Sequence, residues 1–189
     1  MRVTGGKFGG RQLLAPATKR IRPTSDRVRQ AIFNILEHRD FGMSFTLQNA
    51  SVADLFAGTG ALGIEALSRG ARFSLLVDTD AQSRALARAN VEALGLTGAT
   101  KIWRRDATLL GPLGPGANGP FALAFLDPPY GQNLVAPALE ALTTGGWLLG
   151  QALTVIETAK GEHFDHPGFR QLDARNYGDT DVLFLAPAE

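Results

Sequence analysis

Residues 54–63 read Asp54-Leu55-Phe56-Ala57-Gly58-Thr59-Gly60-Ala61-Leu62-Gly63, and this stretch decides the fold. It joins an apolar run, residues 51–55, to a helical pattern over residues 59–69 that ends at Gly70. Glycines at this spacing let a ligand lie against the backbone and let the helix pack close to its strand. The stretch therefore predicts a strand, a ligand-binding loop and a helix in immediate succession.

Strand and helix patterns continue to alternate downstream. The expected strands are 51–55, 73–77, 100–104, 121–126 and 153–158, and the later expected helices are 80–94 and 133–142. Two further strands are expected within residues 168–186. Five alternations followed by a strand pair indicate an α/β fold with an open, mostly parallel sheet and one antiparallel end.

The N-terminal part of the chain differs from this alternating region. We expect a basic N-terminal extension over residues 1–45 and a core over residues 46–189. The extension is expected to contain one helix, which Thr24 and Ser25 can cap and which runs to about His38. The residues expected on its apolar face are Val28, Ile32, Ile35 and Leu36.

Charge is unevenly distributed along the chain. Residues 1–30 hold eight basic side chains and one acidic one, a net charge of +7, so the rest of the chain carries −6 of the overall +1. A basic arm on an acidic body is typical of a protein that binds phosphate groups, although a solvated terminus is the alternative. Glycines among the charges of residues 5–11 favour a loop that approaches nucleic acid closely.

The composition excludes several classes of protein. Without cysteine the chain has no disulfide framework and no thiolate metal site, and its three histidines form no convincing metal cluster. The N-terminus does not read as a signal peptide, and no apolar run approaches the length of a membrane span. We expect a soluble, cytoplasmic protein that uses no metal.

The glycine loop alone leaves two classes of ligand open. Gly58, Gly60 and Gly63 match the dinucleotide fingerprint, and Asp78 follows about twenty residues later, where an acidic residue binds the ribose. A nicotinamide-dependent oxidoreductase is therefore one alternative. Asp54 argues against it, because a carboxylate at the loop entrance repels a pyrophosphate and attracts a ligand with an ammonium and a sulfonium group.

A second chemical signal, Asp127-Pro128-Pro129-Tyr130, ends the apolar run over residues 121–126. Neither proline offers an N–H group, and Pro128 biases Asp127 toward an extended conformation. The Asp127 carboxylate and the Pro128 carbonyl can then each accept one hydrogen from a flat exocyclic amine, while Tyr130 stacks on the ring that carries it. The alternative is an ordinary strand-ending turn with a capping aspartate. In an oxidoreductase that transfers hydride, this tetrapeptide would have no role.

Together these segments resemble the class I S-adenosylmethionine-dependent methyltransferases, in the branch that methylates exocyclic amines. The ends of the chain resemble more narrowly the RsmD family of small-subunit ribosomal RNA guanine-N2 methyltransferases. The residues that carry this resemblance are Arg2-Val3, Gly5-Gly6, Gly10-Arg11, Arg22-Pro23-Thr24, Asp26-Arg27-Val28-Arg29, Phe33-Asn34, 57–71 and Tyr177-Gly178-Asp179-Thr180. The resemblance implies a Rossmann-like fold with a mostly parallel seven-stranded sheet, one antiparallel strand and helices on both faces.

The resemblance also implies roles for individual residues. It gives as catalytic residues Asp127, Pro128 and Tyr130. It gives as cofactor-binding residues Asp54, Phe56, Gly58, Gly60, Asp78, Asp106 and Thr24, and as RNA-binding residues Arg11, Arg20, Arg22 and Arg27. Purely structural roles stay open for Asp106, in a strand-end turn, and for Thr24 and Arg27, at a helix start. Glu157 is a further candidate for a substrate contact.

The implied activity is methyl transfer from S-adenosylmethionine to the N2 of a guanine in small-subunit (16S) ribosomal RNA, with S-adenosylhomocysteine as the product and no metal. The expected partner is that RNA, within the 30S subunit or an assembly intermediate. We expect the protein to act as a monomer and away from membranes. The tetrapeptide suits any flat exocyclic amine, so adenine N6 in RNA or DNA stays an alternative, as does a non-catalytic RNA-binding factor.

Overall fold

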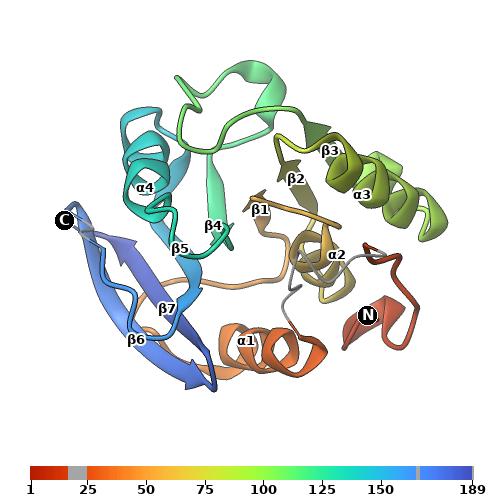
Figure 1. Cartoon of the computed structure of the whole chain (residues 1–189), viewed down its shortest axis with the longest axis horizontal. Coiled ribbons are helices and arrows are strands. Elements are labelled where there is room, and N and C mark those ends of the chain that lie inside the picture. The colour runs from red at the N-terminus through yellow and green to blue at the C-terminus, as the bar shows by residue number, and fades with distance from the viewer. Residues whose placement is uncertain (17–24, 165–166, 189) are drawn as a thin grey trace.

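The computed structural model describes residues 1–16, 25–164 and 167–188. Its centre is a seven-stranded sheet with the order β3-β2-β1-β4-β5-β7-β6 (Figure 1). Neighbouring strands are parallel from β3 to β5, and β7 is antiparallel to both β5 and β6. The expected mostly parallel sheet with one antiparallel strand is confirmed.

The bounds of most elements agree with the periodicity of the sequence. The strands are β1 (Ser51–Leu55), β2 (Phe73–Val77), β3 (Thr100–Trp103), β4 (Phe121–Leu126), β5 (Leu148–Ala159), β6 (Phe169–Tyr177) and β7 (Thr180–Pro187). The helices are α1 (Asp26–His38), α2 (Ala61–Ser68), α3 (Ala81–Ala93) and α4 (Val135–Thr144), with short 3-10 turns η1 (Gly6–Phe8), η2 (Thr97–Ala99) and η3 (Pro115–Ala117). β5 begins at Leu148 rather than at the expected Leu153, because Leu148 already pairs with Phe121 before a shift in register.

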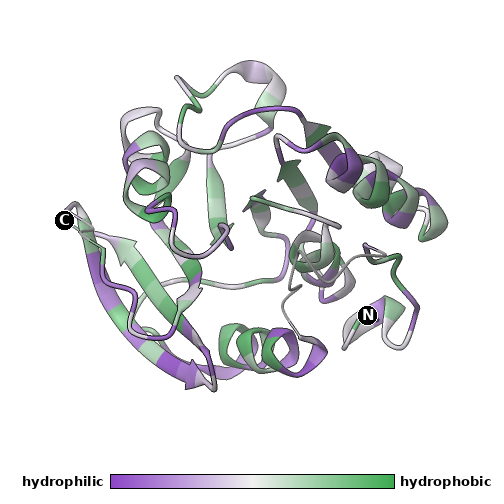
Figure 2. Cartoon of the chain, in the orientation of Figure 1, coloured by the Kyte–Doolittle hydropathy of each residue, from purple (hydrophilic) through white to green (hydrophobic). Residues whose placement is uncertain are grey.

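Helices cover both faces of the sheet, as expected. On one face, Phe125 of β4 belongs to a hydrophobic cluster with residues of α1, α2 and α3. On the other face, Leu126 belongs to a second cluster with residues of α4 and with Trp147. Figure 1 places α4 across the sheet from α1 and α2. The edge strand β6 is largely hydrophilic in Figure 2, so the two cores are centred on the inner strands.

The structure confirms α1 but corrects its buried face. Ser25 caps the helix by accepting a hydrogen bond from the Val28 N–H at 3.2 Å. The expected Val28 and Ile35 are only half-buried, and the buried residues are Arg29, Ile32, Phe33 and Leu36. This face has the helical spacing i, i+3, i+4, i+7. The hydrophobic pattern did not identify it, because the first of its residues is an arginine. Since Arg29 is buried and ion-paired with Asp26 at 2.8 Å, the arm presents less charge to a ligand than its formal +7.

The burial of Arg29 depends on Glu65 of α2, whose side chain is also fully buried. The Nε atoms of Arg29 and Arg69 donate to this carboxylate at 3.3 Å and 2.8 Å. Thr4 donates its backbone N–H at 2.8 Å and its hydroxyl at 2.7 Å to the same group. One buried carboxylate therefore joins the N-terminal arm, α1 and α2.

Two glycines of the arm, Gly5 and Gly6, pack closely against α2, while the expected approach of this loop to nucleic acid stays a prediction. A Cβ atom on Gly5 would collide with the guanidinium of Arg69, and one on Gly6 would collide with the carbonyl of Ser68. The Ser68 hydroxyl donates to the Gly5 carbonyl at 2.6 Å and accepts from the Phe8 N–H at 2.9 Å. Contact with α2 thus explains these glycines. The division into residues 1–45 and 46–189 stays a prediction.

Replacing Glu65 with alanine should lower the free energy of unfolding by about 3–5 kcal/mol, because it removes the carboxylate that Arg29 and Arg69 share in the protein interior. Urea denaturation of the wild type and the variant measures the loss. Glu140→Ala is the matched control, since Glu140 is exposed on α4 and its removal should change stability by no more than about 0.5 kcal/mol. Equal effects of the two changes would contradict the assigned role of Glu65.

Candidate functional site

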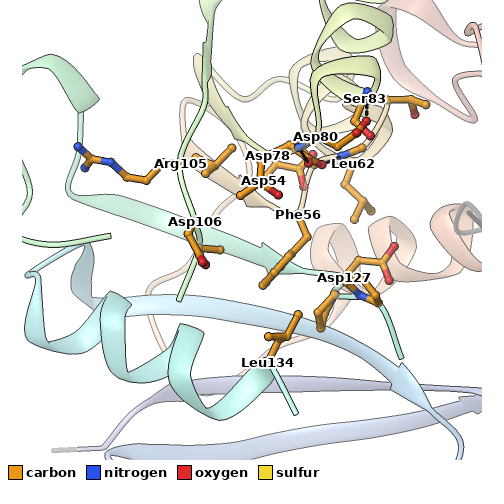
Figure 3. Close-up of a pocket in the computed structure, with 18 of the residues that line it drawn as sticks. Asp54, Phe56, Leu62, Asp78, Asp80, Ser83, Arg105, Asp106, Asp127 and Leu134 are labelled. Atoms are coloured by element: carbon orange, nitrogen blue, oxygen red, sulfur yellow. Dashed lines mark hydrogen bonds between the residues drawn. The ribbon is translucent and has the colours of Figure 1, made fainter. Parts of the chain in front are cut away.

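The carboxyl ends of β1, β2, β3 and β4 meet at one cavity of about 740 Å³. The strand β1 lies between β2 and β4, so the chain crosses from one side of β1 to the other when it passes from β3 to β4. Open α/β sheets bind ligands at such a switch point, outside the carboxyl ends of the strands. Side chains from the four strand ends project into this space in Figure 3.

The glycine loop after β1 forms one wall. Phe56 lines the cavity with a left-handed backbone (φ 62°), a conformation that persists in a non-glycine residue only where the surroundings enforce it. Gly58 also lines it, and its N–H donates to Asp78 Oδ2 at 2.8 Å. Gly60 is not among the lining residues; its φ is 77°, and a Cβ there would lie 2.8 Å from Leu76 Cδ1. Gly60 therefore serves the contact between helix and sheet.

Asp54 carries the most unusual electrostatics of the cavity. It is 1% exposed, and its Oδ2 accepts from the Gly63 N–H at 2.9 Å. Burial raises the pKa of this carboxyl well above its ordinary value; the Gly63 N–H opposes the rise, and the charges of Asp127 and Asp78 add to it. A positively charged ligand group beside Asp54 would stabilise its ionised form.

Asp78, at the end of β2, organises the loops on both sides of it. Its Oδ2 accepts from Gly58, and its Oδ1 accepts from the Asp80 N–H at 2.8 Å. Asp80 in turn caps α3 through the Ser83 N–H at 2.6 Å, and this hydrogen bond lowers the pKa of Asp80. Asp80 lines the cavity as well, although sequence analysis gave it only the capping role. Figure 3 shows Asp54, Asp78 and Asp80 in the same part of the site.

The tetrapeptide after β4 forms another wall, and Asp127, Pro128 and Tyr130 all line the cavity. Asp127 is half-buried, Pro128 is buried and Tyr130 is 38% exposed. The Tyr130 hydroxyl lies 3.1 Å from Oγ1 of Thr180, the first residue of β7. The structure thus places the predicted catalytic residues in one cavity with Asp54, and it brings the late motif that contains Thr180 into contact with them.

Asp106 follows β3, and its position agrees with both interpretations of it. Its Oδ1 accepts from the N–H of Thr108 at 2.8 Å and from the hydroxyl of Thr108 at 2.7 Å, which is a local turn. Asp106 also lines the cavity, together with Arg105 and Ala107. The guanidinium of Arg105 donates to the Leu110 carbonyl at 2.8 Å, so the turn is tied down beyond Thr108.

The other predicted site residues either do not line the cavity or lie outside the residues that the structure describes. Arg11 and Arg27 are exposed and do not line it. Glu157 is buried in β5 and does not line it either. The predicted residues outside the described part of the chain are Thr24, Arg20 and Arg22.

Sequence analysis missed much of the lining. The missed residues include Pro16, Thr59, Leu62, Thr79, Ser83, Arg105 and Leu134. Thr59 and Thr79 adjoin predicted residues, so their place in the loops could have identified them. Pro16 has no such signal, because only the tertiary structure brings it to the glycine loop.

Two general properties of the described part complete the description of the site. Over residues 1–16, 25–164 and 167–188, no group of three or more His, Cys, Asp or Glu side chains is placed to hold a metal ion. Within the same ranges, none of the helices has the length and apolar character needed to cross a membrane.

Asp54→Asn should stabilise the ligand-free protein at neutral pH. The pKa of Asp54 is raised in the folded state, so its favourable contribution is present below the ordinary value of 3.8 and is lost as the pH rises through the folded pKa. The advantage of the asparagine should therefore grow with pH over that interval, by about 1.4 kcal/mol for each unit between the two pKa values. Urea denaturation at a series of pH values measures it.

Asp181→Asn provides a control of opposite sign. Hydrogen bonds from Asn176 and Gly161 lower the pKa of Asp181, so its contribution is present above the ordinary value and is lost as the pH falls through the folded pKa. This variant should be less stable than the wild type at neutral pH. A stability difference for Asp54→Asn that does not vary with pH would contradict the electrostatic account.

Known proteins were compared with this chain. A family model described as "Conserved hypothetical protein 95" matches residues 1–186. The "Ribosomal RNA small subunit methyltransferase D" of Escherichia coli K12 is 35% identical over 159 residues, which are 84% of this chain and 74% of the relative. The protein of the same name from Haemophilus influenzae is 32% identical over 85% of this chain and 79% of its own length.

Solved structures extend the likeness to nearly the whole chain. The Escherichia coli protein yhhF superimposes with a TM-score of 0.81 at 27% identity, over 99% of this chain and 97% of that one. TrmN from Thermus thermophilus, at 22% identity and a TM-score of 0.67 over 85% of this chain and 48% of that one, shares the fold. The fold is the Rossmann-like class I methyltransferase fold, and the chain belongs to the RsmD family of methyltransferases.

Proposed function

We propose that this protein transfers a methyl group from S-adenosylmethionine to the exocyclic N2 of a guanine in small-subunit (16S) ribosomal RNA. One observation carries the proposal: the tetrapeptide Asp127–Tyr130 shares a cavity with the buried Asp54 and with Asp78. The reaction needs a segment that holds an amine and, next to it, an acidic site for a cationic methyl donor.

The charge of the cavity suits S-adenosylmethionine, which carries an ammonium group and supplies a methyl group from its sulfonium. Asp54 would hold the ammonium, because a buried carboxylate is stabilised by a cation beside it. Asp78 would accept the ribose hydroxyls, since each of its oxygens has lone pairs beyond the one that a loop N–H uses. Phe56 and Gly58 would border the cofactor, and Asp106 would accept from the adenine amine. The pyrophosphate of NAD would be repelled by the same carboxylates.

The tetrapeptide would bind and orient the target base. The guanine N2 lone pair is delocalised into the ring, so this amine is a poor nucleophile. Hydrogen bonds from its two N–H groups to the Asp127 carboxylate and the Pro128 carbonyl would favour a pyramidal nitrogen with a directed lone pair. Tyr130 would stack on the base, which must leave its own stack to reach the cavity.

Alignment of the two bound reactants would supply much of the rate. The transfer leaves one excess proton on the nitrogen, and Asp127 accepts a hydrogen bond from that nitrogen in the proposed pose. Its carboxylate is half-buried at the cavity wall, so solvent can carry the proton away from it. The chain has no cysteine, and this route requires no covalent bond between protein and base.

The choice of guanine N2 in ribosomal RNA rests on the family. The relatives from Escherichia coli and Haemophilus influenzae carry small-subunit ribosomal RNA in their names. These names support the same RNA as the substrate here. We propose that the protein acts on it in the cytoplasm, within a 30S subunit or an assembly intermediate. The tetrapeptide alone suits other flat amines, so adenine N6 is the competing target.

The N-terminal arm is the proposed RNA contact. Arg11 and Arg27 are exposed and free of any role in the cavity, and Lys7 is exposed on η1. With Arg20 and Arg22 they would bind phosphates beside the target and steer encounter. Arg29 is excluded from this set because Glu65 and Asp26 hold it inside the protein. We propose that the protein does this as a monomer.

Nucleoside mass spectrometry tests the proposal. The purified protein is incubated with S-adenosylmethionine and, separately, with naked 16S RNA and with 30S subunits from a strain that lacks the gene. We expect new N2-methylguanine, and more of it from the subunit, because folded RNA is recognised largely by shape. New N6-methyladenine would show that the target is adenine N6 and not guanine N2. No methylated product, with intact RNA binding, would favour the non-catalytic factor.

Asp127→Ala should lower turnover by on the order of 100-fold or more, because the variant cannot hold the amine and its proton. S-adenosylhomocysteine affinity, measured by titration calorimetry, should remain within about a factor of three of the wild type, a difference below 1 kcal/mol. Asp127→Asn should keep partial activity, since the amide oxygen still accepts one hydrogen bond. Wild-type turnover in Asp127→Ala would contradict the catalytic role assigned to this residue.

Neutralising Arg11, Arg20 and Arg22 together should make RNA binding less dependent on salt. Each phosphate contact contributes about −0.7 to −0.9 to the slope of log K against log salt concentration, so the triple alanine variant should show a shallower slope. Arg170→Ala, on the exposed edge strand β6, is the control and should leave the slope unchanged. An unaltered slope in the triple variant would mean that these three arginines make no phosphate contact.

A further inference from the structure

The buried amide of Asn90 connects two distant parts of the chain. Asn90 lies on α3 and is 2% exposed, among the residues of the helix that face the core. An amide in such a place is destabilising unless its polar atoms are hydrogen-bonded. Its partners are all backbone groups, and they belong to the N-terminal arm and to the glycine loop.

The hydrogen bonds hold the two segments in one geometry. Asn90 Oδ1 accepts from the Leu14 N–H at 2.7 Å, and its Nδ2 donates to the Leu14 carbonyl at 3.1 Å. The same Nδ2 donates to the Thr59 carbonyl at 3.1 Å. Both backbone groups of Leu14 are thus engaged as a neighbouring strand would engage them, while Thr59 lies between Gly58 and Gly60 of the loop.

Both clamped segments border the cavity. Thr59 lines it directly, and Pro16 lines it two residues after Leu14. On the other side of Leu14, Leu13 is buried in the core with α1 and α3, so the arm is fixed before and at the clamp. Figure 1 shows the N-terminal segment, in red, beside α2, the helix that follows the glycine loop.

We propose that Asn90 is a positioning residue that makes the N-terminal arm a wall of the cofactor cavity. By holding Leu14 and the Thr59 carbonyl together, it sets the distance between Pro16 and the glycine loop, and cofactor affinity depends on that distance. The inference rests on the proposed function, because it takes S-adenosylmethionine as the ligand of this cavity. It assigns the arm a role in cofactor binding that is separate from its charges.

A purely structural asparagine would behave differently. Removing it would lower stability and leave the affinity of the folded protein unchanged. Ser68→Ala tests this distinction, because Ser68 also fixes the arm by two hydrogen bonds, to Gly5 and from Phe8, and Ser68 does not line the cavity. Both variants loosen the arm, but only Asn90→Ala releases it from the glycine loop.

Titration calorimetry of the full chain with S-adenosylhomocysteine, below the melting temperature of every variant, tests the proposal. Asn90→Ala should raise the dissociation constant about tenfold, because residues that line a binding site bind less well when the groups that position them are lost. Ser68→Ala should lower the melting temperature with the dissociation constant unchanged. Pro16→Gly, which removes the wall and keeps the clamp, should also weaken binding, and the double variant Asn90→Ala/Pro16→Gly should lose less than the sum of the two losses.

The outcomes separate the inference from the function on which it rests. If the wild type fails to bind S-adenosylhomocysteine, the proposed function falls and the inference falls with it. If the wild type binds it and both Asn90→Ala and Pro16→Gly bind equally well, only the inference is overturned. Equal losses of affinity in Ser68→Ala and Asn90→Ala would also overturn it, because any loosening of the arm would then suffice. Should Asn90→Ala not fold, Asn90→Asp replaces it, because the aspartate keeps the acceptor for the Leu14 N–H and loses the donor to the Thr59 carbonyl.

Discussion

The buried carboxylate of Glu65 is the interaction on which the arrangement around the cavity depends. It accepts hydrogen bonds from Thr4 of the arm, from Arg29 of α1 and from Arg69 at the end of α2. A buried charge is tolerated only when it is paired and hydrogen-bonded, so these three segments can move apart only at a large loss of stability. Because α2 begins at the glycine loop, the same carboxylate fixes the arm relative to this wall of the cavity.

The cavity brings several carboxylates together. Asp54, Asp78 and Asp127 line the same cavity; burial raises the pKa of Asp54 well above its ordinary value, and the charges of Asp127 and Asp78 add to the rise. The hydrogen bonds that Asp54 and Asp78 accept from loop N–H groups offset part of this repulsion. A cation beside Asp54 would stabilise its ionised form, so we expect the cavity to favour a positively charged ligand. This is a stronger discriminator against NAD than the glycine spacing, which both ligands share.

The sequence predicted most of the sheet because its signals there are local. β1, β2 and β4 have the expected bounds, since each is an apolar run between loop residues. The failures have a common cause in tertiary contact. Arg29 lies on the buried face of α1 because Glu65 receives it, and Gly60 is a glycine because Leu76 packs against it. Pro16 reaches the cavity because Asn90 holds the arm. The members of each pair lie too far apart in the sequence for a local pattern to connect them.

The centre of the site is of a kind that many ligands share. A glycine loop with an acid after the next strand serves dinucleotides as well as S-adenosylmethionine, which is why it left two classes open. The distinguishing walls come from elsewhere: Pro16 from the N-terminal arm, and Tyr130, whose hydroxyl is 3.1 Å from Thr180 at the start of β7. The family resemblance was strongest at these same ends. We therefore expect Pro16 and Tyr130 to help select the ligand, while the sheet supplies the shared frame.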